Sequence, residues 1–169
     1  MEELRDHSNT SSPVHVGPAE GRAVRMPRAR LVTLKVSGEQ TGGAYSLFEV
    51  EVGPGGGEGP HVQHREDECF YVLEGRFGFV VEGEEIGAGP GSLVYVPKGD
   101  LHAFENAGNA TGRMLVSQTP GGAYEGFVEE VGQPVADGSI RPEEEALDDA
   151  ERIAAVGTEY GVEIASPFP

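Results

Sequence analysis

Short runs of apolar and aromatic residues, separated by turn-forming residues, characterise the middle of the chain. Between residues 30 and 118 these runs are RLVTLKV, AYSLFEVEV, ECFYVLEG, RFGFVVEG, SLVYVP and RMLVSQ. Strand-like runs at this close spacing, without helical segments between them, are typical of a β-sandwich or β-barrel. The pattern therefore predicts an all-β domain over 30–118. Six aromatic residues are predicted to lie mostly in the core, with one or two of them lining a ligand cavity, namely Phe70, Tyr71, Phe77, Phe79, Tyr95 and Phe104.

From residue 120 the apolar period changes from that of a strand to that of a helix. A first helix is predicted from apolar residues at i, i+3, i+4 and i+7, which are Tyr124, Phe127, Val128 and Val131. Gly132 is its stop signal. A second helix is predicted to begin near Pro142, with an apolar stripe formed by Leu147, Ala150, Ile153 and Ala154. The final YGVEI segment is predicted to add a short strand, so that residues 119–169 form a helical extension packed on the barrel.

The charge of the chain argues against a nucleic acid as partner. The formal net charge is −17 at pH 7, and Lys35 and Lys98 form no basic patch, whereas nucleic-acid phosphates are met by clustered Lys and Arg. The opening MEELRDHSNTSS is polar, and no apolar run approaches the ~20 residues that cross a bilayer. We therefore expect a cytoplasmic protein without a nucleic-acid or membrane partner. Cys69 is the single cysteine, so no disulfide forms within the chain.

Two segments carry residues of the types that bind metal ions. In the first, His61 and Gln63 lie two apart in a predicted strand and so share a face. A hairpin through the charged turn at 65–67 brings the carboxylate of Glu68 back opposite His61. In the second, a tight turn at 97–99 precedes a strand that presents His102. Two imidazoles and a carboxylate with open positions suit one divalent transition-metal ion, namely Fe, Mn, Ni, Co or Zn.

The fourth ligand position is left open by the sequence. Gln63 is a candidate for it, either directly or by a hydrogen bond to whatever occupies it, and water is another. Strict alternation directs His64 to the outer face, so that His64 replaces Gln63 only if the strand contains a bulge. The alternative to a metal site is a barrel in which His61 and His102 are hydrogen-bonded core residues and Glu68 is their buried partner.

These two segments resemble the two motifs of the cupin family. The first motif, G-x5-H-x-H-x3–4-E-x6-G, is matched by Gly55, His61, Glu68 and Gly75, with Gln63 in place of the second His. The second motif, G-x5-P-x-G-x2-H-x3-N, is matched in full by Gly91, Pro97, Gly99, His102 and Asn106. The resemblance implies a double-stranded β-helix, or jelly-roll barrel, a fold for which cupins are a standard example.

The family resemblance also implies a function for the site. Cupins usually hold their metal with three His and one Glu, which carries over to His61, Glu68 and His102, with Gln63 departing from the pattern. The C-terminal extension loosely resembles that of bacterial quercetin 2,3-dioxygenase-like cupins. It implies a metal-dependent dioxygenase, an oxidoreductase acting on a small aromatic or enol-type substrate, with Glu68 as general base. The alternatives are a metal-dependent lyase or isomerase that needs no O2, and a non-catalytic cupin that binds a small molecule, which Gln63 favours.

The N-terminal residues 1–29 show no apolar periodicity and are predicted to form an arm, either mobile or clasping a neighbour. Single-barrel cupins commonly pair, and an arm of this length reaches a neighbour's sheet edge. We therefore expect a homodimer.

Overall fold

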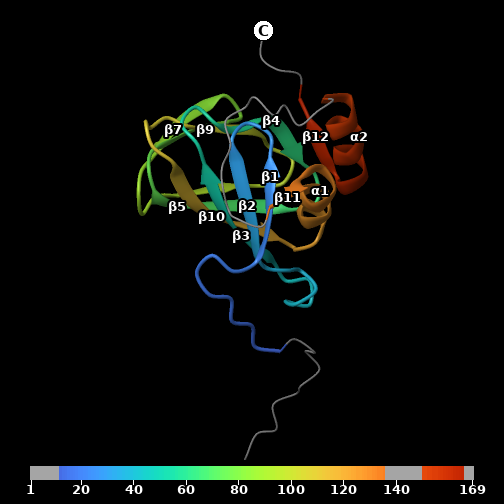
Figure 1. The fold of residues 1–169 in the computed structure, drawn as a ribbon. Coiled ribbons are helices and arrows are strands. Elements are labelled where there is room, and N and C mark those ends of the chain that lie inside the picture. Colours follow the sequence, from blue (N-terminus) through green and yellow to red (C-terminus); the bar gives the residue numbers. More distant parts are fainter. Residues whose placement is uncertain (1–11, 136–149, 166–169) are drawn as a thin grey trace, which may run out of the picture.

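Two antiparallel sheets face each other and form a jelly-roll barrel in the computed structural model, which describes residues 12–135 and 150–165 (Figure 1). The first sheet has the order β11 (Gln133–Pro134), β1 (Arg22–Met26), β2 (Arg30–Val36), β3 (Ser46–Val52), β10 (Gly112–Thr119), β5 (Asp67–Glu74) and β8 (Leu93–Val96). The second has the order β12 (Val162–Ile164), β4 (Gly57–Gln63), β9 (Leu101–Asn106), β6 (Phe77–Val81) and β7 (Glu84–Ala88). The predicted all-β cupin-type fold is confirmed.

The core lies between the two sheets because inward and outward residues alternate along the strands. In β3 every second residue is buried, from Ser46 to Val52. Phe70 packs edge-to-face against Phe79 and Phe104, with ring centroids 5.1 and 5.6 Å apart. The same alternation turns Tyr71, the neighbour of Phe70, outward, and its side chain is 42% exposed. Four of the six predicted aromatic residues thus lie in the core, whereas Tyr71 and Tyr95 are exposed and were wrongly grouped with them.

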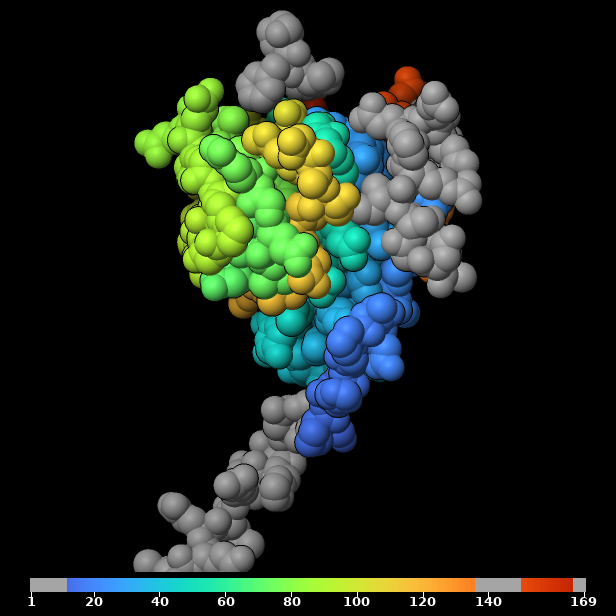
Figure 2. All heavy atoms as spheres, turned by 60° about the vertical axis from the view of Figure 1, so that its left-hand side comes forward, coloured from blue at the N-terminus to red at the C-terminus, as the bar shows by residue number. Residues whose placement is uncertain are grey.

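The predicted N-terminal arm contains a strand that the sequence pattern did not reveal. Residues 22–26 form β1, which pairs with β2 over its whole length and with β11 on its other side. Only Val24 and Met26 of β1 are buried, so the apolar pattern is too short to be recognised among the surrounding polar residues. This part of the arm covers a sheet edge of its own chain. Residues 12–21, which precede β1, lie at the lower end of the barrel in Figure 2.

The C-terminal extension packs against one side of the barrel. Helix α1 (Ala123–Val131) occupies the predicted position and buries the predicted stripe. Helix α2 (Ala150–Tyr160) follows. The start predicted for it near Pro142 lies outside the described residues, and so does Leu147 of its predicted stripe. The two helices touch so closely that a Cβ atom on Gly126 would lie 2.1 Å from the Tyr160 ring. Strand β12, the short strand expected from YGVEI, pairs with β4. Neither described helix has the length and apolar run needed to cross a membrane.

Candidate metal centre

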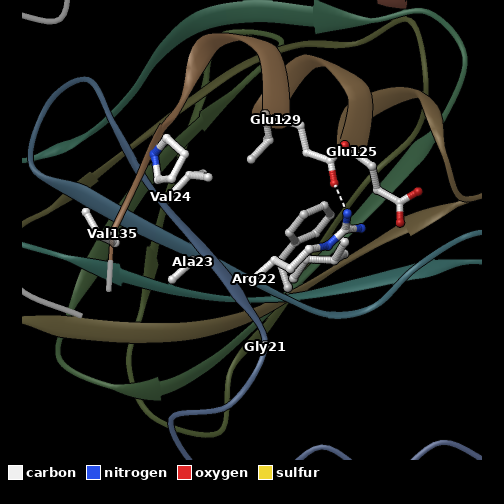
Figure 3. A pocket seen from close by; sticks show the side chains of 11 residues that line it. Gly21, Arg22, Ala23, Val24, Glu125, Glu129 and Val135 are labelled. Atoms are coloured by element: carbon white, nitrogen blue, oxygen red, sulfur yellow. Dashed lines mark ion pairs between the residues drawn. The ribbon is translucent and has the colours of Figure 1, made fainter. Parts of the chain in front are cut away.

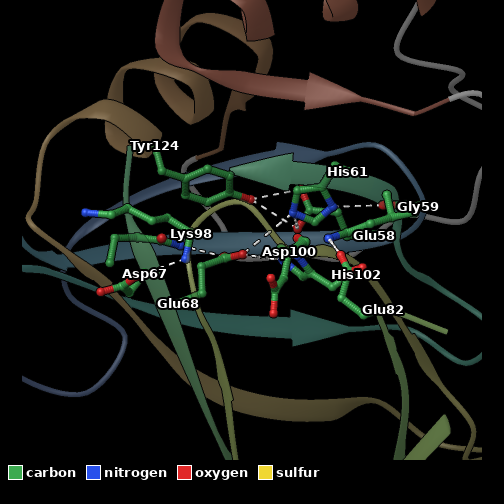
Figure 4. Close-up of polar contacts among 12 residues, drawn as sticks. Glu58, Gly59, His61, Asp67, Glu68, Glu82, Lys98, Asp100, His102 and Tyr124 are labelled. Atoms are coloured by element: carbon green, nitrogen blue, oxygen red, sulfur yellow. Dashed lines mark hydrogen bonds and ion pairs between the residues drawn. The ribbon is translucent and has the colours of Figure 1, made fainter. Parts of the chain in front are cut away.

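His61 on β4, Glu68 on β5 and His102 on β9 converge inside the barrel (Figure 4). The three side chains come from two strands of one sheet and one strand of the other. His61 and His102 are register partners across β4 and β9, and their ring centroids are 4.2 Å apart. One potential ligand atom from each residue lies within 4.8 Å of the other two. All three side chains are buried, since none is more than 2% exposed.

Both histidines are oriented by the backbone. The Nδ1 atom of His61 is 2.9 Å from the carbonyl oxygen of Gly59, and that of His102 is 3.0 Å from the carbonyl oxygen of Asp100. An Nδ1–H donor held in this way leaves the Nε2 lone pair free to bind a metal, and histidine ligands are typically fixed so. The Nε2 atom of His61 has no hydrogen-bond partner among the described residues, although it is fully buried. The donor set therefore fits a metal ion.

Glu68 is held from both of its oxygens. Its Oε2 contacts Nε2 of His102 and lies 3.7 Å from Nε2 of His61. Its Oε1 accepts a hydrogen bond of 2.7 Å from the amide of Gln118. Burial raises the pKa of Glu68, but the hydrogen bonds and charges of the two histidines outweigh burial and hold the pKa well below its usual range. Glu68 is thus a carboxylate over the whole physiological pH range.

Gln118 is a site residue that the sequence analysis missed. It stands opposite Glu68 in the register of β10 and β5, and it is fully buried. The inward positions of β10 before it are Gly112, Met114 and Val116. Gln118 is a polar residue at the next inward position, which was a signal that it belongs to a site. The sequence does not show, however, which strand lies beside Gln118.

Gln63 and His64 lie on opposite faces of the strand end, as alternation predicts. Gln63 is 4% exposed, and its side-chain nitrogen has no hydrogen-bond partner among the described residues. The side chain of His64 is 52% exposed, and its Nε2 pairs with Glu163 at 2.7 Å. His64 is therefore directed away from the barrel interior, whereas Gln63 is buried beside His61.

A second buried network, also missed, lies against the triad. Arg30 Nη1 and Glu58 Oε2 form an ion pair of 3.1 Å. The Tyr124 hydroxyl donates to Glu58 at 3.1 Å, and Figure 4 shows these two residues beside His61. Glu58 Oε2 is also 4.0 Å from Nε2 of His61. Strict alternation places residues 58 and 61 on opposite faces. A register shift between them in the β4–β9 pairing brings both inward.

This network makes the site attractive to a cation. Burial lowers the pKa of His61, but the carboxylates of Glu58 and Glu68 outweigh burial and raise it to about 9. For Glu58, burial raises the pKa, but the charges of Arg30 and His61 outweigh burial and lower it. Two ionised carboxylates therefore surround His61. Their field favours a positive charge there, either a proton or a metal ion.

Helix α1 is fastened over the network by an acidic residue of the β4–β5 turn. The carboxylate of Glu66 accepts hydrogen bonds from the backbone nitrogens of Ala123 at 2.7 Å and of Tyr124 at 3.0 Å. A carboxylate at the first turn of a helix satisfies free N–H donors and interacts favourably with the helix dipole. These bonds hold Tyr124 with its hydroxyl on Glu58.

Space beside the triad is small, whereas two larger cavities lie further out. A hollow of about 10 Å³ is lined by Glu68, Glu58 and Tyr124 among others, which is room for about one water molecule. A cavity of about 230 Å³ lies outside Arg30 and Glu58. Another, of about 420 Å³, lies between β1 and α1, where Arg22 and Glu129 form an ion pair of 2.7 Å (Figure 3).

Comparison with known proteins agrees with this geometry. Residues 48–117 match the family model described as "Cupin domain". The chain is 31% identical over 74 residues to tetracenomycin polyketide synthase protein TcmJ of Streptomyces glaucescens, covering 44% of this chain and 50% of that protein. It is 30% identical over 80 residues to an uncharacterised protein of Methanocaldococcus jannaschii, covering 47% of this chain and 64% of that protein. The matches thus span only half to under two thirds of these curated relatives.

Solved structures show the same fold. The polyketide cyclase RemF of Streptomyces resistomycificus is 28% identical, with a TM-score of 0.56 over 64% of this chain and 80% of that one. A predicted oxalate decarboxylase of Thermotoga maritima is 22% identical, with a TM-score of 0.59 over 63% of this chain and 99% of that one. The family match covers the strands that carry the triad, and the jelly-roll barrel surrounds it, so residues 48–117 form a cupin domain.

Proposed function

We propose that this cupin barrel binds one divalent transition-metal ion through His61, Glu68 and His102 and uses it to transform a small aromatic or enol-type substrate. The observation that carries the proposal is the Nε2 atom of His61, which is fully buried and has no hydrogen-bond partner among the described residues. Leaving such an atom unsatisfied is unfavourable by about 1–3 kcal/mol, and a bound ion removes that penalty. Fe, Mn, Ni, Co and Zn all suit this donor set.

Gln63 is the candidate for the fourth position. It is buried on the same face as His61, and its side-chain nitrogen has no partner among the described residues. Its amide supplies a neutral oxygen ligand or donates a hydrogen bond to a water or substrate atom that takes the position. His64 is unsuitable because its ring points outward to Glu163.

The bound ion would polarise a substrate oxygen or, if redox-active, exchange an electron with it. Glu68 would serve both as a ligand and as the group that accepts the substrate's acidic proton. Gln118 holds Oε1 of Glu68 and so determines which carboxylate oxygen faces the histidines. The hollow beside the triad has room for about one water molecule, so bulk water would be kept away from the ion.

Two reaction classes fit this arrangement. A dioxygenase-type oxidation of an aromatic or enol-type substrate is the first. A ring closure or isomerisation that needs no O2 is the second, and the similarity to the polyketide cyclase RemF and to the polyketide synthase protein TcmJ favours it. Polyketides carry ketone and enol groups, so both classes share the substrate chemistry.

An oxygen-uptake experiment separates the two classes. The protein is loaded in turn with Fe, Mn, Ni, Co and Zn and mixed with a flavonol or an enolic polyketide mimic. Oxygen consumption matched by product formation supports the dioxygenase. Equal product formation without air supports the ring closure or isomerisation. Tight binding of these compounds without any turnover contradicts both and shows a binding protein.

A further inference from the structure

The Arg30–Glu58 ion pair separates two hollows of the protein. Both residues line the inner hollow, which reaches Glu68, and both also line the outer cavity of about 230 Å³. The pair is therefore the shared wall between the outer cavity and the space beside the triad. A molecule that enters the outer cavity meets this ion pair before it meets Glu68.

The outer cavity has apolar walls and a charged floor. Its apolar lining includes Met26 of β1, Phe127 and Val131 of α1, Ile153 of α2 and Ile164 of β12. Arg30 and Glu58 supply its buried charges, since each is less than 9% exposed in its side chain, whereas the third charged lining residue, Arg28, is 41% exposed and pairs with Glu105. The outer cavity, at about 230 Å³, is smaller than the ~300–1,000 Å³ of pockets that hold drug-sized ligands. A flat molecule of one or two rings fits such a space.

A buried ion pair is a weak source of stability, because desolvation of both partners offsets most of their attraction. Arg30 nevertheless has a fixed position: its Nε donates to the carbonyl oxygen of Pro27 at 3.2 Å, and its Nη1 donates to Glu58. Glu58 has a further donor in the Tyr124 hydroxyl. Glu58 therefore keeps a hydrogen bond when Arg30 turns part of its guanidinium towards another anion.

The charges around the triad favour such an anion. With a divalent ion held by neutral histidines, the ion and Arg30 contribute three positive charges, and Glu58 and Glu68 contribute two negative ones. One positive charge is left uncompensated in a buried region, where charges interact strongly. A singly charged anion neutralises it. This charge count rests on the metal ion of the proposed function, whereas binding of an anion by Arg30 does not require that ion.

We propose that the outer cavity binds a flat aromatic or enolic molecule with a single acidic group, a carboxylate or phenolate, and that Arg30 is the receptor for that group. Arginine suits this role because its planar guanidinium binds an oxyanion through two parallel hydrogen bonds. The apolar walls take the ring. The Arg30–Glu58 ion pair makes the cavity selective for the charge of the ligand. The substrate approaches Glu68 from this cavity.

A binding experiment with 2-naphthoate and its neutral analogue 2-naphthamide tests the proposal. Full-length protein is titrated both after chelation and after loading with zinc. We expect the acid to bind at least about tenfold more tightly than the amide in both forms, as a charge-assisted hydrogen bond allows. Arg30→Gln should lose this preference. Glu58→Gln should bind the acid several-fold more tightly, because a competing anion is removed, although it melts at a lower temperature.

Arg22→Gln is the matched control, because Arg22 is an exposed arginine that lines the other cavity (Figure 3). It should bind 2-naphthoate as the parent does. Equal binding of acid and amide, or a loss on Arg22→Gln instead of Arg30→Gln, would overturn the proposal. If Arg30→Gln does not fold, Glu58→Gln provides the test instead. Unchanged or weaker binding of 2-naphthoate by Glu58→Gln would then overturn the proposal. Metal content, measured on the same samples, separates the two hypotheses: anion binding to a chain that takes up no metal contradicts the proposed function alone.

Discussion

His61 and His102 face each other across β4 and β9 as register partners, and each is tethered through Nδ1 to the carbonyl oxygen two residues before it. The same local bond at both positions directs both Nε2 atoms to one point, where Glu68 Oε2 also lies. This repeated geometry is what an ion-binding site requires and what two unrelated core histidines would not need.

Replacing Gln63 by His tests the fourth position. Gln63→His puts an imidazole where a neutral amide now lies, so we expect metal binding to become tighter by about 10–100-fold. His64→Ala is the control, since His64 points outward, and it should leave the metal affinity unchanged. Metal dissociation constants of the parent and both variants provide the comparison. Loss of metal in His64→Ala, with no gain in Gln63→His, would show that the ligand assignment along β4 is wrong.

Gln118 should matter for metal binding although it carries no charge. Gln118→Met keeps the side-chain volume but removes the donor to Glu68 Oε1, so that Glu68 is held only through Oε2. We expect the metal affinity to fall by about 10–100-fold, as for other residues that position a ligand. Competition with a chelating dye measures it. Ser117→Ala, one residue earlier on β10, is the control. An affinity in Gln118→Met equal to that of the parent contradicts the positioning role.

Metal binding should depend on pH through His61. Its pKa in the metal-free chain is raised to about 9, so a metal ion must displace a proton below that pH. The apparent affinity should therefore rise about tenfold per pH unit towards pH 9 and then level off. In the metal-free chain the raised pKa means that protonation stabilises the fold. That contribution is complete below the ordinary value of 6.5 and is lost as the pH rises through about 9.

Calorimetry in two buffers of different ionisation enthalpy counts the released protons. Release of close to one proton at pH 7 is the expected result. An affinity that does not change between pH 6 and pH 8 would mean that His61 is neutral before the metal arrives.

A homodimer remains a prediction, and the structure suggests where it forms. The face of β5 and β8, green to yellow-green and turned forward in Figure 2, carries Leu93 and Tyr95, which are 59% and 55% exposed. β8 is also an edge strand of its sheet, and exposed apolar edges are pairing sites. We expect light scattering to give a dimer that Leu93→Lys converts to a monomer. Tyr45→Lys, at another exposed aromatic, should leave it intact. A monomer mass for the parent at every concentration contradicts the prediction.

The sequence predicted those parts of the molecule that depend on local spacing. Alternation was enough for β3 and for the inward side of Gln63, and the helical period was enough for α1. The motif spacing placed His61, Glu68 and His102 in one group, and the structure brings them together.

The missed residues all depend on contacts between distant segments. Glu58 turns inward because of a bulge that alternation cannot show. Gln118 meets Glu68 only because β10 pairs with β5. Tyr124 was recognised as an apolar position of a helix, but its hydroxyl bond to Glu58 depends on how that helix docks.

The metal content of tag-free protein tests the central claim most directly, with His102→Ala as the decisive variant. Elemental analysis of the parent, after equilibration with a mixture of divalent transition metals and dialysis, should give about one equivalent per chain. His102→Ala should retain almost none while keeping the circular dichroism of a folded β-barrel, because the core is large enough to fold without an ion. A full equivalent of metal in folded His102→Ala, or a parent that binds none, would contradict the metal centre built on His61, Glu68 and His102.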